Sequence, residues 1–282
     1  MATEGPARAG RGRLVAVTLG VVAIVLAGTA LIVVLRDRGT TTAPPAATPG
    51  TSAHASTTPS ATPSATVTGS PSNPLAVTLP SPYQPLWPFR DLAEVTAWQA
   101  SYTSGGHQPW HTDPAETALS FAQGYLDYPD IDRVVAQSVN GPDAHVSVGY
   151  LDPNGAAVTA AVVHVLVFGT ASPPAWEVVG TDDTTLTLDE PAYGVVVGTP
   201  LTVGGLITGV DESLHVQVHQ IGTASLVGDT CCVAAGGQAQ AWSARVAYAG
   251  ATDHVLTVSV STGGHVQGVE RFAVTAVLRP GA

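Results

Sequence analysis

The stretch Leu214-His-Val-Gln-Val-His219 alternates apolar and polar side chains over six consecutive residues. Successive side chains of a β-strand point to opposite faces of a sheet, so Leu214, Val216 and Val218 are expected to face a core. His215 and His219 are then expected on the solvent face, roughly 13 Å apart and too far from one another to share a metal ion. The pattern predicts one strand of a half-buried antiparallel sheet.

The same alternation recurs in three later segments, at residues 242–248, 256–260 and 272–278. In the last segment, Phe272, Val274 and Ala276 occupy every second position and predict a single core-facing side. Short alternating strands separated by glycine-rich turns are typical of a β-sandwich. We therefore expect an all-β sandwich over residues 185–282.

The order of these segments also carries a family resemblance. It runs through Gly194-Val-Val-Val-Gly-Thr-Pro200-Leu-Thr-Val-Gly204, Glu212-Ser-Leu-His-Val-Gln-Val218, Trp242-Ser-Ala-Arg-Val-Ala-Tyr248, Leu256-Thr-Val-Ser-Val260 and Phe272-Ala-Val-Thr-Ala-Val-Leu278. This order resembles the GerM-associated immunoglobulin-like domain of bacterial spore-germination proteins. The resemblance covers the C-terminal third of the chain and implies an extracytoplasmic module for binding or assembly at the cell envelope, in germination-type processes. The resemblance implies no catalytic residues.

Residues 83–184 carry helix signals first and strand signals afterwards. Asp91, with Glu94 three residues later, has the capping pattern of a helix start, and Asp113 followed by proline is a second start signal. Strands are expected at residues 132–139, 145–151, 157–168 and 176–181. This order predicts a small α+β domain of two helices and an antiparallel sheet, similar in shape to cystatin-like or nuclear-transport-factor-like cone folds.

The N-terminal part of the chain predicts a membrane anchor and a stalk. The run from Leu14 to Leu35 is uncharged and apolar, long enough to cross a bilayer once as a helix. Residues 1–13 would form a cytoplasmic tail, and residues 39–82, rich in Thr, Ser, Pro and Ala, a disordered stalk. We expect a single-pass cell-membrane protein with its C-terminal domains outside the cytoplasm.

The charge balance limits the partners. Beyond residue 38 the chain has five arginines and nineteen aspartates and glutamates, and it has no lysine anywhere. Nucleic acid is therefore not expected as a partner, whereas cationic ligands, divalent ions held by the cell wall, or simple solubility fit the acidic surface. We expect an envelope protein or polysaccharide as partner, and no cofactor.

The aromatic residues of the first folded region suggest a contact surface. Trp87, Trp98 and Trp110, with His107 and His111, are candidates for the rim of a ligand groove. The alternative is that these aromatic side chains form the core of a small domain. No metal site is predicted from the two histidines, because Pro109 prevents a regular helical pair and no second group of ligands is evident.

Cys231 and Cys232 are adjacent in the sequence. A bridge between neighbours requires a strained vicinal ring, for which the surrounding glycine-rich loop leaves room. A vicinal disulfide, a pair of free or buried thiols, and a reactive redox or metal site are all open at this point.

The sequence shows none of the familiar motifs of nucleophilic or metal-dependent hydrolysis. We therefore expect a binding or assembly protein of the envelope and not an enzyme. The alternative is a hydrolase acting on the cell wall, or a small-ligand-binding protein, with His107, His111 or Asp113 at the mouth of the first folded region.

Overall fold

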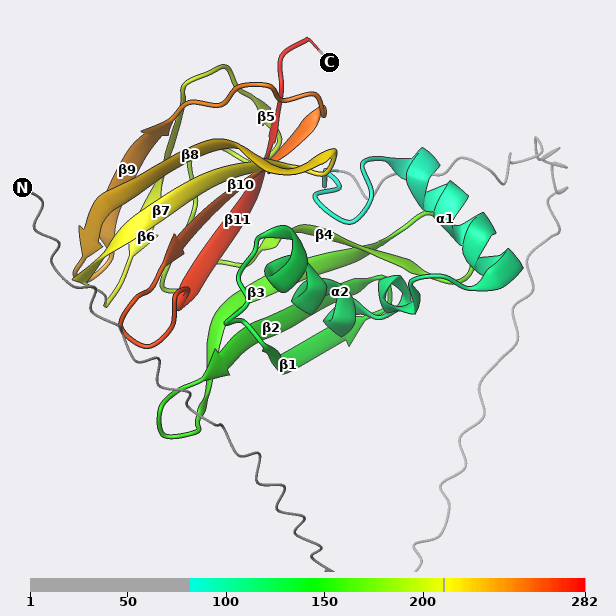
Figure 1. Ribbon diagram of the computed structural model, residues 1–282, viewed down its shortest axis with the longest axis horizontal. Helices are drawn as coiled ribbons and strands as arrows, with labels where there is room; N and C mark the ends of the chain where they lie inside the picture. Colours follow the sequence, from blue (N-terminus) through cyan, green and yellow to red (C-terminus); the bar gives the residue numbers. More distant parts are fainter. Residues whose placement is uncertain (1–81, 210, 282) are drawn as a thin grey trace, which may run out of the picture. The chain divides into compact units, whose positions relative to one another are not determined.

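The computed structural model describes residues 82–209 and 211–281, which form mostly antiparallel sheets with few helices (Figure 1). The predicted anchor at Leu14–Leu35 and most of the predicted stalk lie outside these residues. Within the described part of the chain, no helix combines the length and the apolar character that a membrane crossing requires.

The helices come first in the chain. Helix α1 spans Leu92–Gly105 and begins where Asp91 accepts a hydrogen bond from the backbone N–H of Glu94. It ends at Gly106, whose left-handed backbone (φ 63°) favours glycine. After the short 3₁₀ helix η1 (Pro109–Thr112), helix α2 (Pro114–Ser120) is capped by Asp113 and continues as the π-helix η2 (Phe121–Tyr125). Both helix starts agree with their sequence signals.

Four strands follow and pair in chain order as an antiparallel meander, which we call the meander sheet. They are β1 (Arg133–Asn140), β2 (Asp143–Leu151), β3 (Ala157–Phe168) and β4 (Ala175–Thr181). Helix α2 lies over one face of this sheet (Figure 1), where Phe121, Val146 and Val163 are fully buried. On the other face, Val95 and Trp98 of α1 pack against Phe168.

The rest of the chain forms two further sheets around a second core. The strands are β5 (Val195–Val196), β6 (Leu201–Ile207), β7 (Asp211–Gln220), β8 (Thr223–Gly236), β9 (Gln240–Val246), β10 (Val255–Thr262) and β11 (Arg271–Leu278). One sheet has the order β5-β11-β10-β7-β8 and the other pairs β6 with β9. Leu214, Val216 and Val218 are fully buried between them, as their alternation predicted.

Strand β11 differs from its prediction, because both of its faces are buried. Phe272 and Val274 pack into the core of the meander sheet, whereas Ala273 and Val277 pack into the second core. A half-buried strand has one apolar face, so the apolar residues on both faces of β11 reflect its place between two cores. The two parts of the fold therefore share this strand.

The contact between the two parts also has a polar region. The Tyr128 hydroxyl lies within hydrogen-bond distance of the Gln217 side-chain oxygen (3.2 Å) and of the Ser259 hydroxyl (3.3 Å), and the Tyr125 hydroxyl lies 3.2 Å from that of Thr257. His219 lies in this contact, 3.1 Å from the Ser259 hydroxyl and only 6% exposed. The expectation that His219 faces solvent is therefore wrong, because the outer face of its strand is covered by the π-helix region.

Candidate binding site

A pocket of about 430 Å³ opens where the two parts of the fold meet. We call it the junction pocket. Its wall includes Tyr83, His164 and Asp182 from the first part of the fold, and Asp189, Tyr193 and Thr275 from the second. Contacts between separately packed parts are a common place for ligand sites, so this position makes the pocket a candidate.

The lining of the junction pocket is acidic and aromatic. Asp182, Asp183 and Asp189 contribute carboxylates and no arginine lines the pocket, in a chain without lysine. Tyr83 and Tyr193 meet edge to face with ring centroids 5.9 Å apart. Carboxylates and aromatic faces both attract positive charge, so the lining suits a cationic group.

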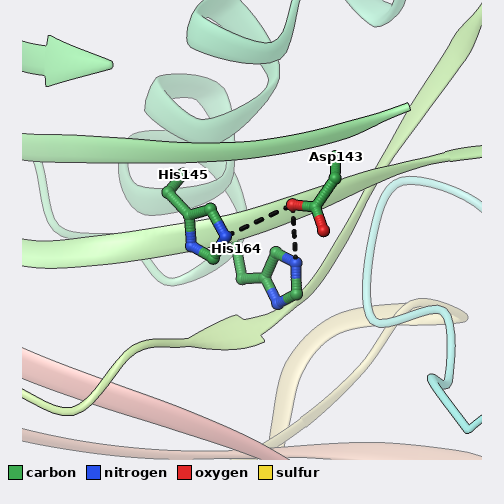
Figure 2. Close-up of side chains that lie close together, drawn as sticks. All are labelled: Asp143, His145 and His164. Carbon is green, nitrogen blue, oxygen red and sulfur yellow. Dashed lines mark hydrogen bonds and ion pairs between the residues drawn. The ribbon is translucent and has the colours of Figure 1, made fainter. Parts of the chain in front are cut away.

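His164 and Asp182 of the pocket wall also belong to a hydrogen-bonded group of four side chains, which we call the Asp–His cluster. It consists of Asp143, His145 and His164 of the meander sheet (Figure 2), and of Asp182, which directly follows β4. One carboxylate oxygen of Asp143 lies 3.2 Å from Nε2 of His145 and 3.1 Å from Nε2 of His164. The two imidazole rings are stacked, with centroids 4.4 Å apart and planes 11° from parallel. Nδ1 of His145 lies 2.7 Å from a carboxylate oxygen of Asp182.

The register of β2 and β3 brings the two histidines together. Next to the turn that joins the two strands, Leu151 of β2 pairs with Ala157 of β3. If the pairing continued without irregularity, His145 would lie opposite Val163. A bulge beside Gly149 adds one residue to β3, so that His164 faces His145 instead. Only glycine fits at position 149, since a Cβ there would lie 1.8 Å from the carbonyl oxygen of Val158.

The Asp–His cluster is open on one side. The side chains of Asp143 and His145 are 45% and 40% exposed, whereas that of His164 is only 11% exposed. Within the described ranges, Asp143, His145 and His164 are the only three potential metal ligands whose donor atoms all lie within 4.8 Å of one another. The sequence did not reveal this cluster, because His164 and Asp182 are distant in the chain from Asp143 and His145, and the bulge hides the alignment of the two histidines.

The aromatic residues singled out from the sequence form a packed cluster and not an open groove. Trp87 stacks on Trp110 with ring centroids 4.9 Å apart, and Trp98 is 8% exposed. His111 is 3% exposed and surrounded by the rings of Phe89, Trp98 and Trp110. The alternative interpretation, a set of core aromatics, describes these residues better than the predicted rim.

The three residues expected at the mouth of the first folded region do not converge. His107 is exposed, and its carbonyl accepts a hydrogen bond from the indole of Trp98. Asp113 caps α2 by accepting from the backbone N–H of Ala115 and Glu116. His111 is buried, and neither of its ring nitrogens has a hydrogen-bond partner. Burial lowers the pKa of His111 to about 4, so this ring is neutral at physiological pH.

Glu177 is a second titratable group buried on the same side of the sheet. It is fully buried, and its carboxyl oxygens lie 3.3 Å from the backbone nitrogen of Phe89, which donates to them. Burial raises the pKa of Glu177 well above its ordinary value, only partly offset by the backbone N–H donors. The buried carboxyl group therefore ties the segment before α1 to strand β4.

A larger pocket of about 620 Å³ lies at the start of α1. Its acidic groups and its arginine already have partners: Arg90 donates to Glu94, Asp91 accepts from the backbone N–H of Glu94, and Asp253 accepts from the backbone N–H of Gly222. Its size alone therefore does not make it the better candidate.

Cys231 and Cys232 form a disulfide in β8, and both residues are exposed. Nearby, His215 of β7 is paired with Asp229 of β8. This pair resembles the Asp–His cluster in composition, but no third potential metal ligand joins it among the described residues.

Comparison with protein-family models, with curated proteins and with solved structures finds no match. Function must therefore be argued from the sites themselves.

Proposed function

We propose that this chain is a membrane-anchored, extracytoplasmic binding or assembly protein of the cell envelope that holds a positively charged ligand group in the junction pocket. The proposal rests on the lining of that pocket, which has three carboxylates and two tyrosines, and in which His164 is the one basic side chain among the described residues. A primary ammonium group, as in diamino acids and amino sugars, is the chemistry that such a lining attracts.

The placement outside the cytoplasm rests on the sequence. The apolar run at Leu14–Leu35 supplies the anchor, and the Thr/Ser/Pro/Ala segment supplies the spacer. We also propose that strands β5–β11 are an immunoglobulin-like module, from the segment order of the C-terminal third. The two-sheet arrangement of these strands supports that assignment.

The close contact between the two parts of the fold supports a binding role. Ser259 is fully buried and Thr257 is 2% exposed in this contact, so the walls of the junction pocket belong to one packed unit. A preformed pocket loses little conformational entropy when it binds a ligand. This arrangement favours recognition of a ligand without a large rearrangement.

The ligand proposal is tested by titrating the full-length chain in detergent with putrescine and, separately, with succinate. We expect saturable binding of the diamine and none of the dicarboxylate. Changing Asp183 and Asp189 together to Asn should weaken diamine binding about tenfold or more, because charged hydrogen-bond partners are lost. Glu116→Gln, an exposed carboxylate on α2, is the matched control. Equal diamine affinity in parent and double variant would refute the pocket assignment.

The topology is tested on intact cells that express the chain. An external protease should release a fragment containing residues 82–282 without cell lysis. Protection of this fragment until the membrane is broken would contradict the extracytoplasmic placement.

A further inference from the structure

We propose that Asp143, His145 and His164 bind a divalent transition-metal ion such as Zn²⁺, and that Asp182 orients His145 for this role. The inference goes beyond the ligand proposed for the junction pocket and does not depend on it. It rests on the atoms that converge in Figure 2.

The first argument is geometric. Asp143 and His145 are two residues apart on β2 and point to the same face, and His164 lies directly opposite His145 on β3. The Asp143 oxygen is 3.1 and 3.2 Å from the two Nε2 atoms. Ligand atoms about 2.1 Å from one ion are separated by roughly 3.0–3.4 Å in octahedral or tetrahedral coordination. These two oxygen–nitrogen distances fall in this range, and all three donor atoms lie within 4.8 Å of one another.

The second argument concerns protons. If Nδ1 of His145 donates its proton to Asp182, the ring can donate to Asp143 from Nε2 only as an imidazolium. His164 also points Nε2 at the same oxygen, so two ring nitrogens and one carboxylate oxygen face a common point. A divalent cation at this point would accept a lone pair from each of the three atoms, with neither Nε2 atom protonated.

The third argument is the position of Asp182. Metal-binding histidines usually donate their other ring N–H to a carboxylate, which fixes the tautomer and the ring orientation. The 2.7 Å contact between Asp182 and Nδ1 of His145 is such an interaction and leaves Nε2 free for a metal. It makes Asp182 a positioning residue and not a ligand.

The ligand set also indicates the class of ion. Two imidazoles and one carboxylate favour Zn²⁺ and neighbouring transition metals over Mg²⁺ and Ca²⁺, which prefer oxygen ligands. The exposure of Asp143 and His145 leaves room at the ion for water or for a group from a bound molecule. The site would therefore keep open coordination positions.

The test uses the full-length chain in detergent, stripped of metal with a chelator and titrated with Co²⁺. Visible ligand-field absorption reports the coordination of Co²⁺, and Zn²⁺ is then added to displace it. We expect one equivalent to bind, with nitrogen and oxygen ligands, and Zn²⁺ to compete. Absence of saturable binding, or binding of Mg²⁺ and Ca²⁺ with equal affinity, would overturn the proposal.

The variants separate the roles of the residues. Asp182→Asn keeps all three ligands and should weaken Co²⁺ binding about 10–100-fold. His145→Ala and His164→Ala should each weaken it at least as much and change the absorption bands. His215→Ala removes the other exposed histidine–aspartate pair and should keep the parental affinity and spectrum. Parental binding by His145→Ala or His164→Ala would refute the assignment.

A folding control makes a negative result interpretable. The unfolding midpoint of each variant is measured with chelator present, where metal cannot contribute. With Zn²⁺ added, the parent and His215→Ala should shift to a higher midpoint, because an ion that binds only the folded state stabilises it. His145→Ala should show no shift. An equal shift in all proteins would place the metal elsewhere.

Discussion

Two regions of the structure place histidine in opposite surroundings. His111 is 3% exposed, has no hydrogen-bond partner for either nitrogen and is surrounded by aromatic rings. His145 is partly exposed and has a carboxylate at each nitrogen. A buried neutral ring acts as an aromatic packing unit, whereas a ring held between carboxylates can exchange protons or bind a cation. Surroundings, and not residue type, decide between these roles.

We therefore expect one region to contribute stability and the other to contribute binding. The aromatic cluster around His111 should control the free energy of unfolding and leave cation binding unaffected. The Asp–His cluster should control cation binding and leave the free energy of unfolding almost unchanged. Substitutions in the two regions test this division.

The largest effect is expected for Trp98→Ala. Trp98 packs against Phe89, Tyr102 and His111, and its removal leaves a cavity in the core beneath α1. We expect a loss of about 3–5 kcal/mol in the free energy of unfolding, measured by chemical denaturation. A loss below about 1 kcal/mol, the scale of an ordinary surface change, would mean that this cluster is not a structural core.

The next largest effect is expected in the pH dependence of stability that His111 causes. Burial lowers the pKa of His111 from 6.5 to about 4, so the unfolded chain binds this proton more readily than the folded protein does. The stability that His111 contributes is complete above about pH 6.5 and is lost as the pH falls toward 4, by about 3 kcal/mol.

His111→Leu should remove this part of the acid sensitivity. Burial lowers the pKa of His219 to about 4 as well, so some acid sensitivity should persist in the variant. Unfolding curves at pH 7 and pH 4 measure the difference between the two proteins. Identical pH profiles would show that His111 is not buried as a neutral ring.

Glu177→Gln should act with the opposite sign. The pKa of Glu177 is raised in the folded protein, so its contribution is complete below about pH 4.5 and is lost as the pH rises. Glutamine can still accept a hydrogen bond from Phe89 but does not ionise. We expect the variant to be more stable than the parent by roughly 1–3 kcal/mol at pH 8 and close to it at pH 4. Lower stability at pH 8 would contradict a protonated Glu177.

The smallest effect is expected for His145→Ala in the absence of metal. Because His145 and its two aspartate partners are partly exposed, the ion pairs contribute little, and stability should change by less than about 1 kcal/mol. Chemical denaturation with chelator present measures this change. A loss of unfolding free energy as large as that of Trp98→Ala would contradict the proposal that the two regions have different roles.

Local signals in the sequence predicted most of the strands and both helix starts. Asp91 and Asp113 each cap a helix through contacts within three residues, so sequence proximity was sufficient. The alternation of Leu214, Val216 and Val218 likewise predicted their burial. These features depend on backbone period and on neighbours in the chain, which a sequence displays directly.

The candidate site could not be predicted in the same way. His107 and His111 stood out because they are close in sequence, yet a proline-containing turn places one in solvent and the other in the core. His145 and His164 are 19 residues apart and align only because of the bulge at Gly149. A one-residue shift in register moves a side chain to the opposite face, and no local pattern revealed this shift.

Strand β11, which belongs to two cores, also has a consequence for cooperativity. Unfolding one part of the structure would strip Phe272 and Val274, or Ala273 and Val277, of their packing and expose apolar surface on the part that remained. Partial unfolding is therefore costly, and heat or denaturant should produce a single transition reported alike by probes in either part. A fragment that ends at residue 184 would lack the strand that completes its own core. It should therefore expose apolar surface and aggregate. The two parts are therefore expected to fold together and not separately.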